Sequence, residues 1–241
     1  MKRIIGIIIG IIIVGVLGFL TWTQLNSESG GVDFKQYDFN TVIEGNSDNG
    51  NIADHVKGSK DAKVLIFEYA DYQCSGCASV RDDVDRLVKK YGDKIGVVQR
   101  SYVLSYHNNG VAAAHAAEAA GLQGYWAEMG ELLFANQNDW FYSNETECDA
   151  QFTEYFSKAT DGKGDIDKFL ADKESEDVAK KVNFDMGIGK KVGNIDYTPA
   201  FFIDNEFIDW ANNGASSKYV NTDKKDFVDF FSEIIDAKLA E

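Results

Sequence analysis

The stretch EYADYQCSGCASV, residues 68–80, contains two of the three cysteines of this chain, Cys74 and Cys77. A continuous apolar run, VLIF at residues 64–67, comes directly before it. Such a run is typical of a strand that is buried on both faces, as in a parallel sheet. Three kinds of site use this cysteine spacing: a zinc site, a structural disulfide, and a dithiol that is oxidised and reduced during a reaction.

The residues that follow predict a β-α-β unit. Apolar residues recur at three- and four-residue steps from Cys77 to Tyr91, and Gly92 comes next, so the spacing predicts a helix over residues 75–91. Residues 95–103, IGVVQRSYV, predict a second strand. We expect the crossover between the two strands to be right-handed.

The remainder of the chain predicts a helical block and then β-β-α. Residues 111–134 are rich in Ala and contain no proline, and shorter helical patterns continue to about residue 187. AFFID and EFID, on either side of Asn205, predict an antiparallel hairpin. The apolar residues of the last segment, 224–241, recur on one face of a helix.

The first segment predicts a membrane anchor. Lys2 and Arg3 precede a predominantly apolar run at residues 4–22, and the next charged residue is Glu28. At ~1.5 Å per residue such a helix nearly spans a bilayer core of about 30 Å. A cleavable signal peptide is the alternative, although the small-residue cleavage site typical of one is not found. Positive charge before the run predicts a cytoplasmic N-terminus and a domain on the other side of the membrane.

We therefore expect three parts in the chain. Residues 1–26 would form a cytoplasmic stub and a transmembrane signal anchor. Residues 27–50, rich in Ser, Gly and Asn, would form a flexible tether. Residues 51–241 would form the folded domain, with a helical insertion at about 107–190.

Composition narrows the classes of partner. Hydrophobic residues make up 44% of the 241 residues, which is enough for a packed core. The net charge of -15 repels phosphate backbones, so nucleic acid is not expected as a partner.

The position of the cysteine pair favours redox chemistry. Outside the cytoplasm, disulfides persist. A thiol in the first turn of a helix faces unpaired backbone N–H groups and the positive end of the helix dipole, and both lower its pKa. Cys74 has that position, and Cys77, one turn further along, is close enough to attack a mixed disulfide formed at Cys74.

The other two interpretations of the cysteine pair, a zinc site and a structural disulfide, have weaker support in the sequence. A zinc site needs two more ligands, and the chain has no second C-x-x-C motif and no closely spaced histidine pair. A disulfide between residues three apart closes a small loop and removes little entropy from the unfolded chain. Cys148 is expected to be a lone thiol, exposed or half-buried, and His107 and His115 are expected to cap or pack rather than catalyse.

Pro199 is the only proline in the chain, and it stands in NIDYTPAFFID just before the second apolar strand. A cis X–Pro bond there would turn the chain sharply and leave the preceding backbone groups free for an incoming peptide. A trans proline that simply begins a strand is the alternative.

Taken together, a strand leading into CSGC at a helix start, a helical block, and Thr198-Pro199 before FFI resemble the thioredoxin superfamily. The closest resemblance within it is to the DsbA-like thiol–disulfide oxidoreductases. Residues 58–74 resemble that family's approach to the active site, and residues 107–140 resemble the start of its helical domain. The implied fold class is α/β: a thioredoxin fold, β-α-β … β-β-α, with an inserted helical domain, preceded by one N-terminal transmembrane helix.

The resemblance also implies roles for particular residues. Cys74 would be the attacking cysteine and Cys77 the resolving one. Thr198 and Pro199 would form a cis-proline loop that faces the disulfide and contacts the substrate backbone. Glu68 matches the place where relatives keep a buried acid, and a desolvated carboxyl there would relay a proton for Cys77. The alternative is that Glu68 lies at the end of a strand and points to solvent.

One departure from the family affects the expected direction of electron flow. Ser75-Gly76 stands where DsbA-like oxidases often have proline followed by histidine or an aromatic residue, so a cationic partner for the thiolate is missing. We expect an enzyme of the cytoplasmic membrane, single-pass and with its catalytic domain outside, that exchanges disulfides with cysteine-containing exported proteins. Oxidation is the favoured direction, and a reductase or isomerase is the alternative, followed by a non-catalytic peptide-binding module. The redox-active disulfide Cys74–Cys77 would serve without another cofactor, and a membrane or small-molecule redox partner would restore it.

Overall fold

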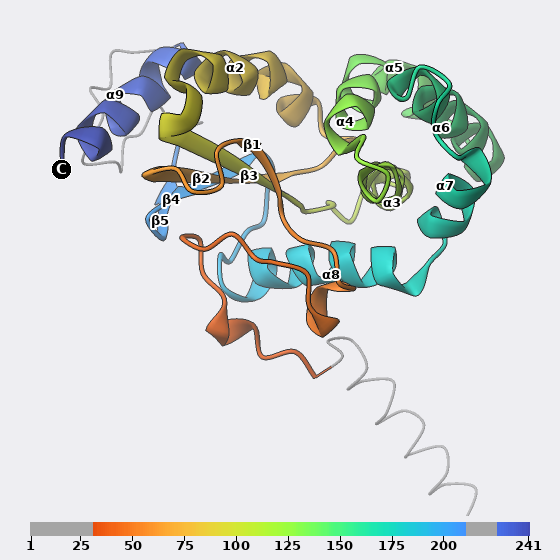
Figure 1. Cartoon of the computed structure of the whole chain (residues 1–241), viewed down its shortest axis with the longest axis horizontal. Coiled ribbons are helices and arrows are strands. Elements are labelled where there is room, and N and C mark those ends of the chain that lie inside the picture. Colours follow the sequence, from red (N-terminus) through yellow and green to blue (C-terminus); the bar gives the residue numbers. More distant parts are fainter. Residues whose placement is uncertain (1–30, 211–225) are drawn as a thin grey trace, which may run out of the picture. The chain divides into compact units, whose positions relative to one another are not determined.

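The β-α-β … β-β-α order expected around the cysteines is present in the structure, a computed structural model that describes residues 31–210 and 226–241 (Figure 1). The first unit comprises β2 (Val64–Ala70), α2 (Ser75–Tyr91) and β3 (Ile95–Ser101), and the last comprises β4 (Ala200–Ile203), β5 (Glu206–Ile208) and α9 (Phe227–Ala240). The predicted α/β fold class is therefore confirmed for these elements.

The five strands of the described residues form one sheet in the order β1-β3-β2-β4-β5. β2 and β3 run parallel, and the other neighbouring pairs are antiparallel. β1 (His55–Gly58) is a short edge strand that the sequence pattern did not indicate, because its side chains are only half-buried. The central strand β2 is almost wholly buried, which agrees with its continuous apolar sequence.

Helices α2 and α9 cover one face of the sheet, and α8 (Glu176–Lys191) lies on the other (Figure 1). The core under α2 and α9 is made of aliphatic and phenylalanine side chains from the sheet and both helices, among them Ile66, Val84, Leu87, Phe201 and Phe231. Each such side chain stabilises the fold by roughly 1.5–3 kcal/mol on burial. This packing fixes the start of α2, and with it Cys74, against the end of β2.

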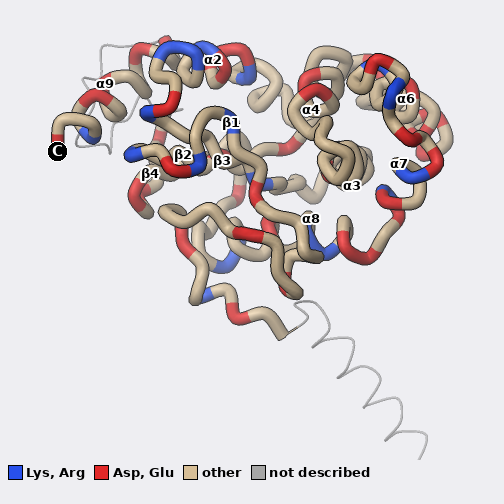
Figure 2. Tube along the Cα trace, in the orientation of Figure 1, with Lys and Arg blue, Asp and Glu red and all other residues tan. Residues whose placement is uncertain are grey.

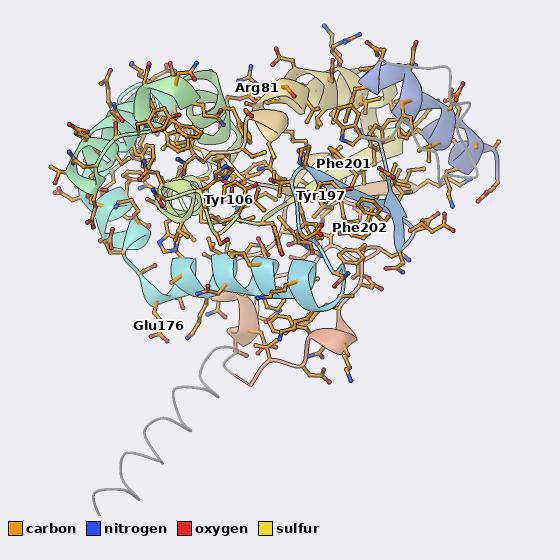
Figure 3. The ribbon with its side chains drawn as sticks, turned by 180° about the vertical axis from the view of Figure 1, so that it is seen from behind. Arg81, Tyr106, Glu176, Tyr197, Phe201 and Phe202 are labelled. Atoms are coloured by element: carbon orange, nitrogen blue, oxygen red, sulfur yellow. The ribbon has the colours of Figure 1, made fainter. Side chains whose placement is uncertain are left out.

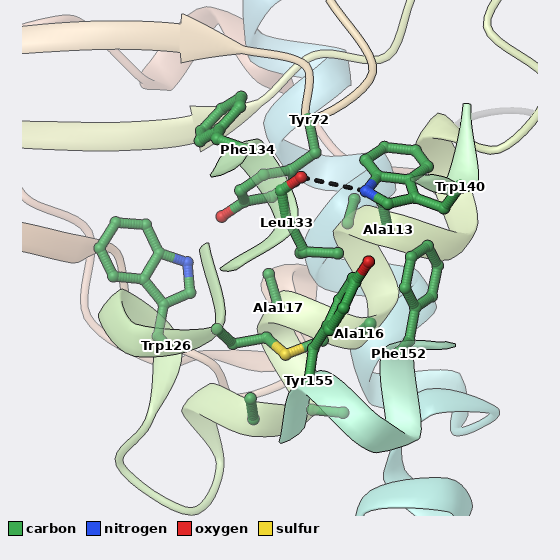
Figure 4. Close-up of a cluster of buried hydrophobic side chains, with 14 of the residues drawn as sticks. Tyr72, Ala113, Ala116, Ala117, Trp126, Leu133, Phe134, Trp140, Phe152 and Tyr155 are labelled. Atoms are coloured by element: carbon green, nitrogen blue, oxygen red, sulfur yellow. Dashed lines mark hydrogen bonds between the residues drawn. The ribbon is translucent and has the colours of Figure 1, made fainter. Parts of the chain in front are cut away.

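Six helices lie between β3 and β4, and together they form the helical block. The structure describes this part of the chain throughout. Besides α8 they are α3 (Gly110–Gly121), α4 (Trp126–Ala135), α5 (Gln137–Trp140), α6 (Glu145–Ala159) and α7 (Ile166–Lys173). The Ala-rich stretch expected as one helical segment is two helices, because the chain turns at Gly124, whose φ is +85°. The small, buried alanines of α3 allow the surrounding helices to approach it closely (Figure 4).

The core of the helical block is aromatic. The indole N–H of Trp140 donates to the Leu133 carbonyl at 3.0 Å, and the Trp140 ring contacts Phe152 (Figure 4). Cys148, on α6, belongs to this core and is only 1% exposed. The expectation of an exposed or half-buried thiol is therefore wrong, because the face of α6 that carries Cys148 packs on Trp140.

A buried ion network joins α8 to the sheet and to the segment before β1. Asp54 accepts hydrogen bonds from Arg100 of β3 at 2.7 Å and from Lys181 of α8 at 3.1 Å. Lys181 also donates to Asp185 at 2.7 Å, and all four side chains are inaccessible to solvent. Burial by itself would raise the pKa of Asp54, but the two cations outweigh it and hold that pKa well below its usual range. Removing any one of these side chains would leave a buried charge unpaired, so each of the four is needed for the stability of the fold.

The second half of the expected tether packs against the domain instead. Phe39 is 3% exposed and stacks on Phe202 at 4.0 Å between ring centroids. Its backbone N–H donates to the side chain of Asn205 at 2.7 Å. Asn49 is also buried, and its carboxamide caps a short turn. This polar segment also contains the apolar residues Phe39 and Ile43, and burial of their side chains holds the segment against the domain.

The predicted anchor at residues 1–26, and the first residues of the tether, lie outside the described residues. None of the helices within residues 31–210 and 226–241 is long and apolar enough to cross a bilayer.

Candidate active site

Cys74 is the residue that immediately precedes α2. Its backbone is extended, with φ -80° and ψ 122°, and no side chain caps the first turn of the helix. The N–H groups of that turn therefore face Cys74 without a competing acceptor. Cys74 and Cys77 are both buried and both present as free thiols.

The Cys74 thiol contacts the loop before β4. Its Sγ donates to the Thr198 carbonyl oxygen at 3.4 Å. The Thr198–Pro199 bond is cis. A Cβ placed on Gly76 would lie 3.3 Å from Pro199 Cδ and 3.5 Å from Cys74 Sγ, so glycine between the cysteines allows the proline loop to approach closely. The structure thus brings together Cys74, Cys77, Thr198 and Pro199, all four of them predicted from the sequence.

The two thiols are made unequal by their surroundings. The pKa of Cys74 is lowered to about 5, chiefly by a hydrogen bond with Cys77, and further by the side chain of Thr198 and by the backbone N–H groups of Cys77 and Gly76. Burial opposes this shift but does not cancel it. The pKa of Cys77 is raised well above its usual value, first by burial and then by its interaction with Cys74. In its thiol form Cys74 donates to Thr198, but its lowered pKa favours the thiolate at neutral pH, whereas the raised pKa of Cys77 keeps that thiol protonated.

Glu68 is buried in the middle of the sheet, 5% exposed, with Gln99 of β3 and Phe201 of β4 as its neighbours in register. The solvent-facing alternative is therefore wrong. Burial raises the pKa of Glu68 to about 7, and the Lys57 ammonium offsets part of that rise. The charge of Glu68 also contributes, after burial and Cys74, to the raised pKa of Cys77, so the carboxyl and the buried thiol interact.

Several polar residues that hold the cysteine loop had no assigned role in the sequence. The buried Asp71 carboxylate accepts hydrogen bonds from the Leu104 N–H at 2.9 Å and from His107 Nδ1 at 2.7 Å. The Gln73 carboxamide accepts from the Asn109 N–H and donates to the Phe141 carbonyl, both at 2.8 Å. In the sequence, the only sign of this role is that Asp71 and Gln73 are polar and stand between a buried strand and Cys74. That position does not reveal their hydrogen-bond partners, which lie more than thirty positions further along the chain.

No cluster of three His, Cys, Asp or Glu side chains placed to hold a metal ion occurs in the part of the chain that the structure describes. Cys148 packs on Trp140 in the core of the helical block. Two thiols of unequal acidity at a helix start, beside the loop that contains the cis Thr198–Pro199 bond, are an arrangement suited to thiol–disulfide exchange.

Comparison with solved structures finds the same fold in several proteins. BdbD from Bacillus subtilis superposes with a TM-score of 0.61 and 22% identity, over 84% of this chain and 100% of that one. The alpha-DsbA1 protein of Wolbachia pipientis gives 0.58 and 20%, over 78% and 91% of the two chains. The catalytic domain of Proteus mirabilis ScsC gives 0.57 and 17%, over 81% and 92%. At these identities the likeness is one of fold.

Curated relatives are longer proteins. The Na(+)/H(+) antiporter NhaA of Herminiimonas arsenicoxydans is 28% identical over 200 residues, which is 83% of this chain and 29% of that protein. The Na(+)/H(+) antiporter NhaA 1 of Mycobacterium sp. (strain KMS) is 37% identical over 92 residues, 38% of this chain and 15% of that protein. The chain thus spans less than a third of the length of these relatives.

The family model described as thioredoxin matches residues 50–220, a stretch that contains the cysteine pair, the helical block and the proline loop. The predicted thioredoxin fold is confirmed, and the predicted resemblance to DsbA-like proteins is confirmed at the level of the fold. This chain belongs to the thioredoxin family and has the fold of its DsbA-like members.

Proposed function

We propose that this protein is a thiol–disulfide oxidoreductase that forms disulfides in exported proteins through Cys74 and Cys77. The observation that carries the proposal is the Cys74 thiol at the start of α2, with a pKa of about 5 and in contact with the Thr198 carbonyl. A stabilised thiolate favours the reduced protein over its disulfide, which makes the disulfide an oxidant. This supports oxidation as the forward direction despite the Ser75-Gly76 departure.

In the oxidised enzyme, a substrate thiolate attacks Cys74 Sγ. The Cys74–Cys77 bond breaks, its electron pair leaves on Cys77 Sγ, and a mixed disulfide joins the substrate to Cys74. A second substrate thiolate then attacks the substrate sulfur of that mixed disulfide, and Cys74 leaves as a thiolate. The substrate has lost two electrons and the enzyme has gained them, so a membrane or small-molecule oxidant must restore the disulfide.

Glu68 has the properties of a proton relay for this cycle. The Cys77 thiolate that leaves is basic because it is buried, and it must take up a proton. A carboxyl with a pKa of about 7 holds a proton in part of the population at neutral pH and exchanges it readily. We assign Glu68 the delivery of that proton to Cys77.

Thr198 and Pro199 would present the substrate to Cys74. An extended peptide that pairs with the backbone beside Thr198 would bring its sulfur to the Cys74 thiol. Exposed rings that adjoin residues bonded to the cysteine loop would contact its side chains: Tyr106, 70% exposed, precedes His107, and Tyr142, 92% exposed, follows Phe141. Tyr197 directly precedes Thr198, and Figure 3 labels it together with Tyr106. Acidic residues are spread along the described chain (Figure 2), so the proposed partners are proteins rather than nucleic acids.

The proposed location is outside the cytoplasmic membrane, held there by the apolar run at residues 4–22. Exported proteins meet an oxidising environment on that side, where a disulfide donor is useful and its product persists.

A glutathione redox titration of the full chain carrying Cys148→Ser, followed by thiol alkylation, tests the function. A potential in the range of about -120 to -180 mV supports donation of disulfides, whereas about -270 mV indicates a reductase supplied with electrons. A pair that does not oxidise and reduce reversibly would contradict the catalytic proposal and favour a peptide-binding module.

A further inference from the structure

The backbone of Asp71 contacts both cysteines of the pair. Its N–H donates to Cys77 Sγ with an N···S distance of 3.5 Å. Its carbonyl oxygen accepts from the Cys74 N–H at 3.0 Å. The peptide groups of this one residue therefore determine how the pair lies at the end of β2.

The Asp71 side chain fixes that backbone in place. The carboxylate has no access to solvent, and it accepts three hydrogen bonds: from the Gln73 N–H at 2.8 Å, the Leu104 N–H at 2.9 Å and His107 Nδ1 at 2.7 Å. Of the three donors, His107 supplies the only one from a side chain. A buried carboxylate that loses a donor loses a charge-assisted hydrogen bond and is left undersatisfied. The loop would then shift to recover a partner.

We propose that Asp71 and His107 form a positioning pair that holds the Asp71 N–H on Cys77 Sγ, where it stabilises the charge that develops when Cys77 leaves. The inference rests on the proposed function and deepens it. When a thiolate attacks Cys74 Sγ, a new S–S bond forms there, the Cys74–Cys77 bond breaks, and its electron pair moves to Cys77 Sγ. An N–H directed at that sulfur is a hydrogen-bond donor to the developing anion, in a site where burial disfavours the charge.

This role differs from the one proposed for Glu68 in the stage of the reaction at which it acts. Glu68 supplies a proton after Cys77 has left, whereas the Asp71 N–H acts while the S–S bond is breaking. His107 acts on the sulfurs only through Asp71. Its ring also contacts Tyr106, with 4.7 Å between centroids, so a test must preserve the volume of the side chain.

Two substitutions at position 107 separate the donor from the ring. His107→Phe keeps a ring against Tyr106 but has no donor for Asp71. His107→Asn places an N–H near the position of Nδ1 and should restore the bond. If His107→Phe does not fold, His107→Leu, which has nearly the shape of Asn without the donor, replaces it. His115→Phe is the matched control, because His115 lies on α3 and bonds to the carbonyl of Lys173 on α7, whereas His107 lies before α3.

The first measurement is the rate at which dithiothreitol reduces the Cys74–Cys77 disulfide of the full chain, followed by alkylation. His107→Phe loses the hydrogen bond to Asp71, and the Asp71 N–H is then no longer held on Cys77 Sγ. If this costs the transition state about one hydrogen bond, the rate should be about fivefold lower in His107→Phe and near that of the wild type in His107→Asn and in His115→Phe. An unchanged rate in a folded His107→Phe variant would overturn the positioning pair.

The second measurement removes Cys77 as the leaving group. In a Cys77→Ser background, the pH dependence of Cys74 alkylation by iodoacetamide should be the same with and without the His107→Phe substitution. A loss of Cys74 reactivity in the doubly substituted chain would mean that the pair merely supports the whole loop, and would also overturn the inference. Failure of the proposed function is distinct, because it would appear in the wild type as a disulfide that does not form reversibly.

Discussion

Cys74 Sγ lies 3.4 Å from the carbonyl oxygen of Thr198, a residue 124 positions further along the chain. The contact joins the start of α2 to the loop before β4, two parts of the molecule that the whole helical block separates in sequence. It places the Cys74 thiol beside the cis Thr198–Pro199 bond, directly before β4.

Replacing the attacking cysteine should abolish turnover. With Cys74→Ser, no sulfur remains to form the mixed disulfide, so oxidation of a reduced, unfolded protein should fall to the uncatalysed rate. Cys148→Ser is the matched control and should retain activity, because Cys148 lies on α6 in the core of the helical block. Turnover that persists in Cys74→Ser would contradict the mechanism.

The reactivity of Cys74 should titrate with an apparent pKa of about 5, because its thiolate is stabilised by Cys77, by the side chain of Thr198 and by the first N–H groups of α2. The rate of alkylation by iodoacetamide should be constant above neutral pH and fall as the pH drops through 5. Cys77→Ala removes the largest of these influences and should move the pKa of Cys74 upward. An unchanged profile in Cys77→Ala would show that the helix start alone sets the acidity.

Glu68 should make the protein less stable as the pH rises. Its folded pKa of about 7 lies above its usual value of 4.5, so the folded protein binds more protons than the unfolded chain between these pH values. The contribution of Glu68 to the free energy of unfolding is then fully present below pH 4.5 and lost as the pH rises through 7. At about 1.4 kcal/mol per unit, the loss amounts to a few kcal/mol.

Urea denaturation at pH 5 and pH 8 measures this effect. Glu68→Gln should reduce the difference in the free energy of unfolding between the two pH values. Glu176→Gln, at an exposed position, should leave it as in the wild type (Figure 3). Equal pH dependence in wild type and Glu68→Gln would show that Glu68 is ionised in the fold at no cost.

Phe39 should contribute to stability as a core residue of the domain. Phe39→Ala removes a buried ring stacked on Phe202 and should lower the free energy of unfolding by about 3–5 kcal/mol. Phe207→Ala, at a partly exposed position on β5, should cost about 1 kcal/mol or less. Equal effects of the two substitutions would mean that residues 39–50 do not belong to the folded domain.

Local patterns in the sequence were enough to predict most elements. The apolar run of β2, the helical spacing of α2 and the hairpin at Asn205 correspond to elements at those positions. Asp204 and Asn205 both adopt positive φ in the hairpin turn, a conformation that these residue types tolerate well. The edge strand β1 lacked such a pattern, because its side chains are only half-buried.

Predictions were less successful where burial depends on distant partners. The segment around Phe39 has the composition of a tether, and rings of β2 and β4, among them Phe67 and Phe202, give it a place to pack. Cys148 stands among polar residues in the sequence, yet its side of α6 faces the Trp140 core. In both cases the neighbours in space are supplied by other elements.

The sequence by itself determined that two cysteines stand at a helix start after a buried strand, and that a single proline precedes a later strand, because these features follow from local periodicity and residue type. Only the tertiary structure decided that Cys74 meets Thr198, that Glu68 is buried, and that His107 bonds to Asp71. Such contacts form when packed elements bring distant residues together, and the resulting desolvation and hydrogen bonds set the acidity of each thiol.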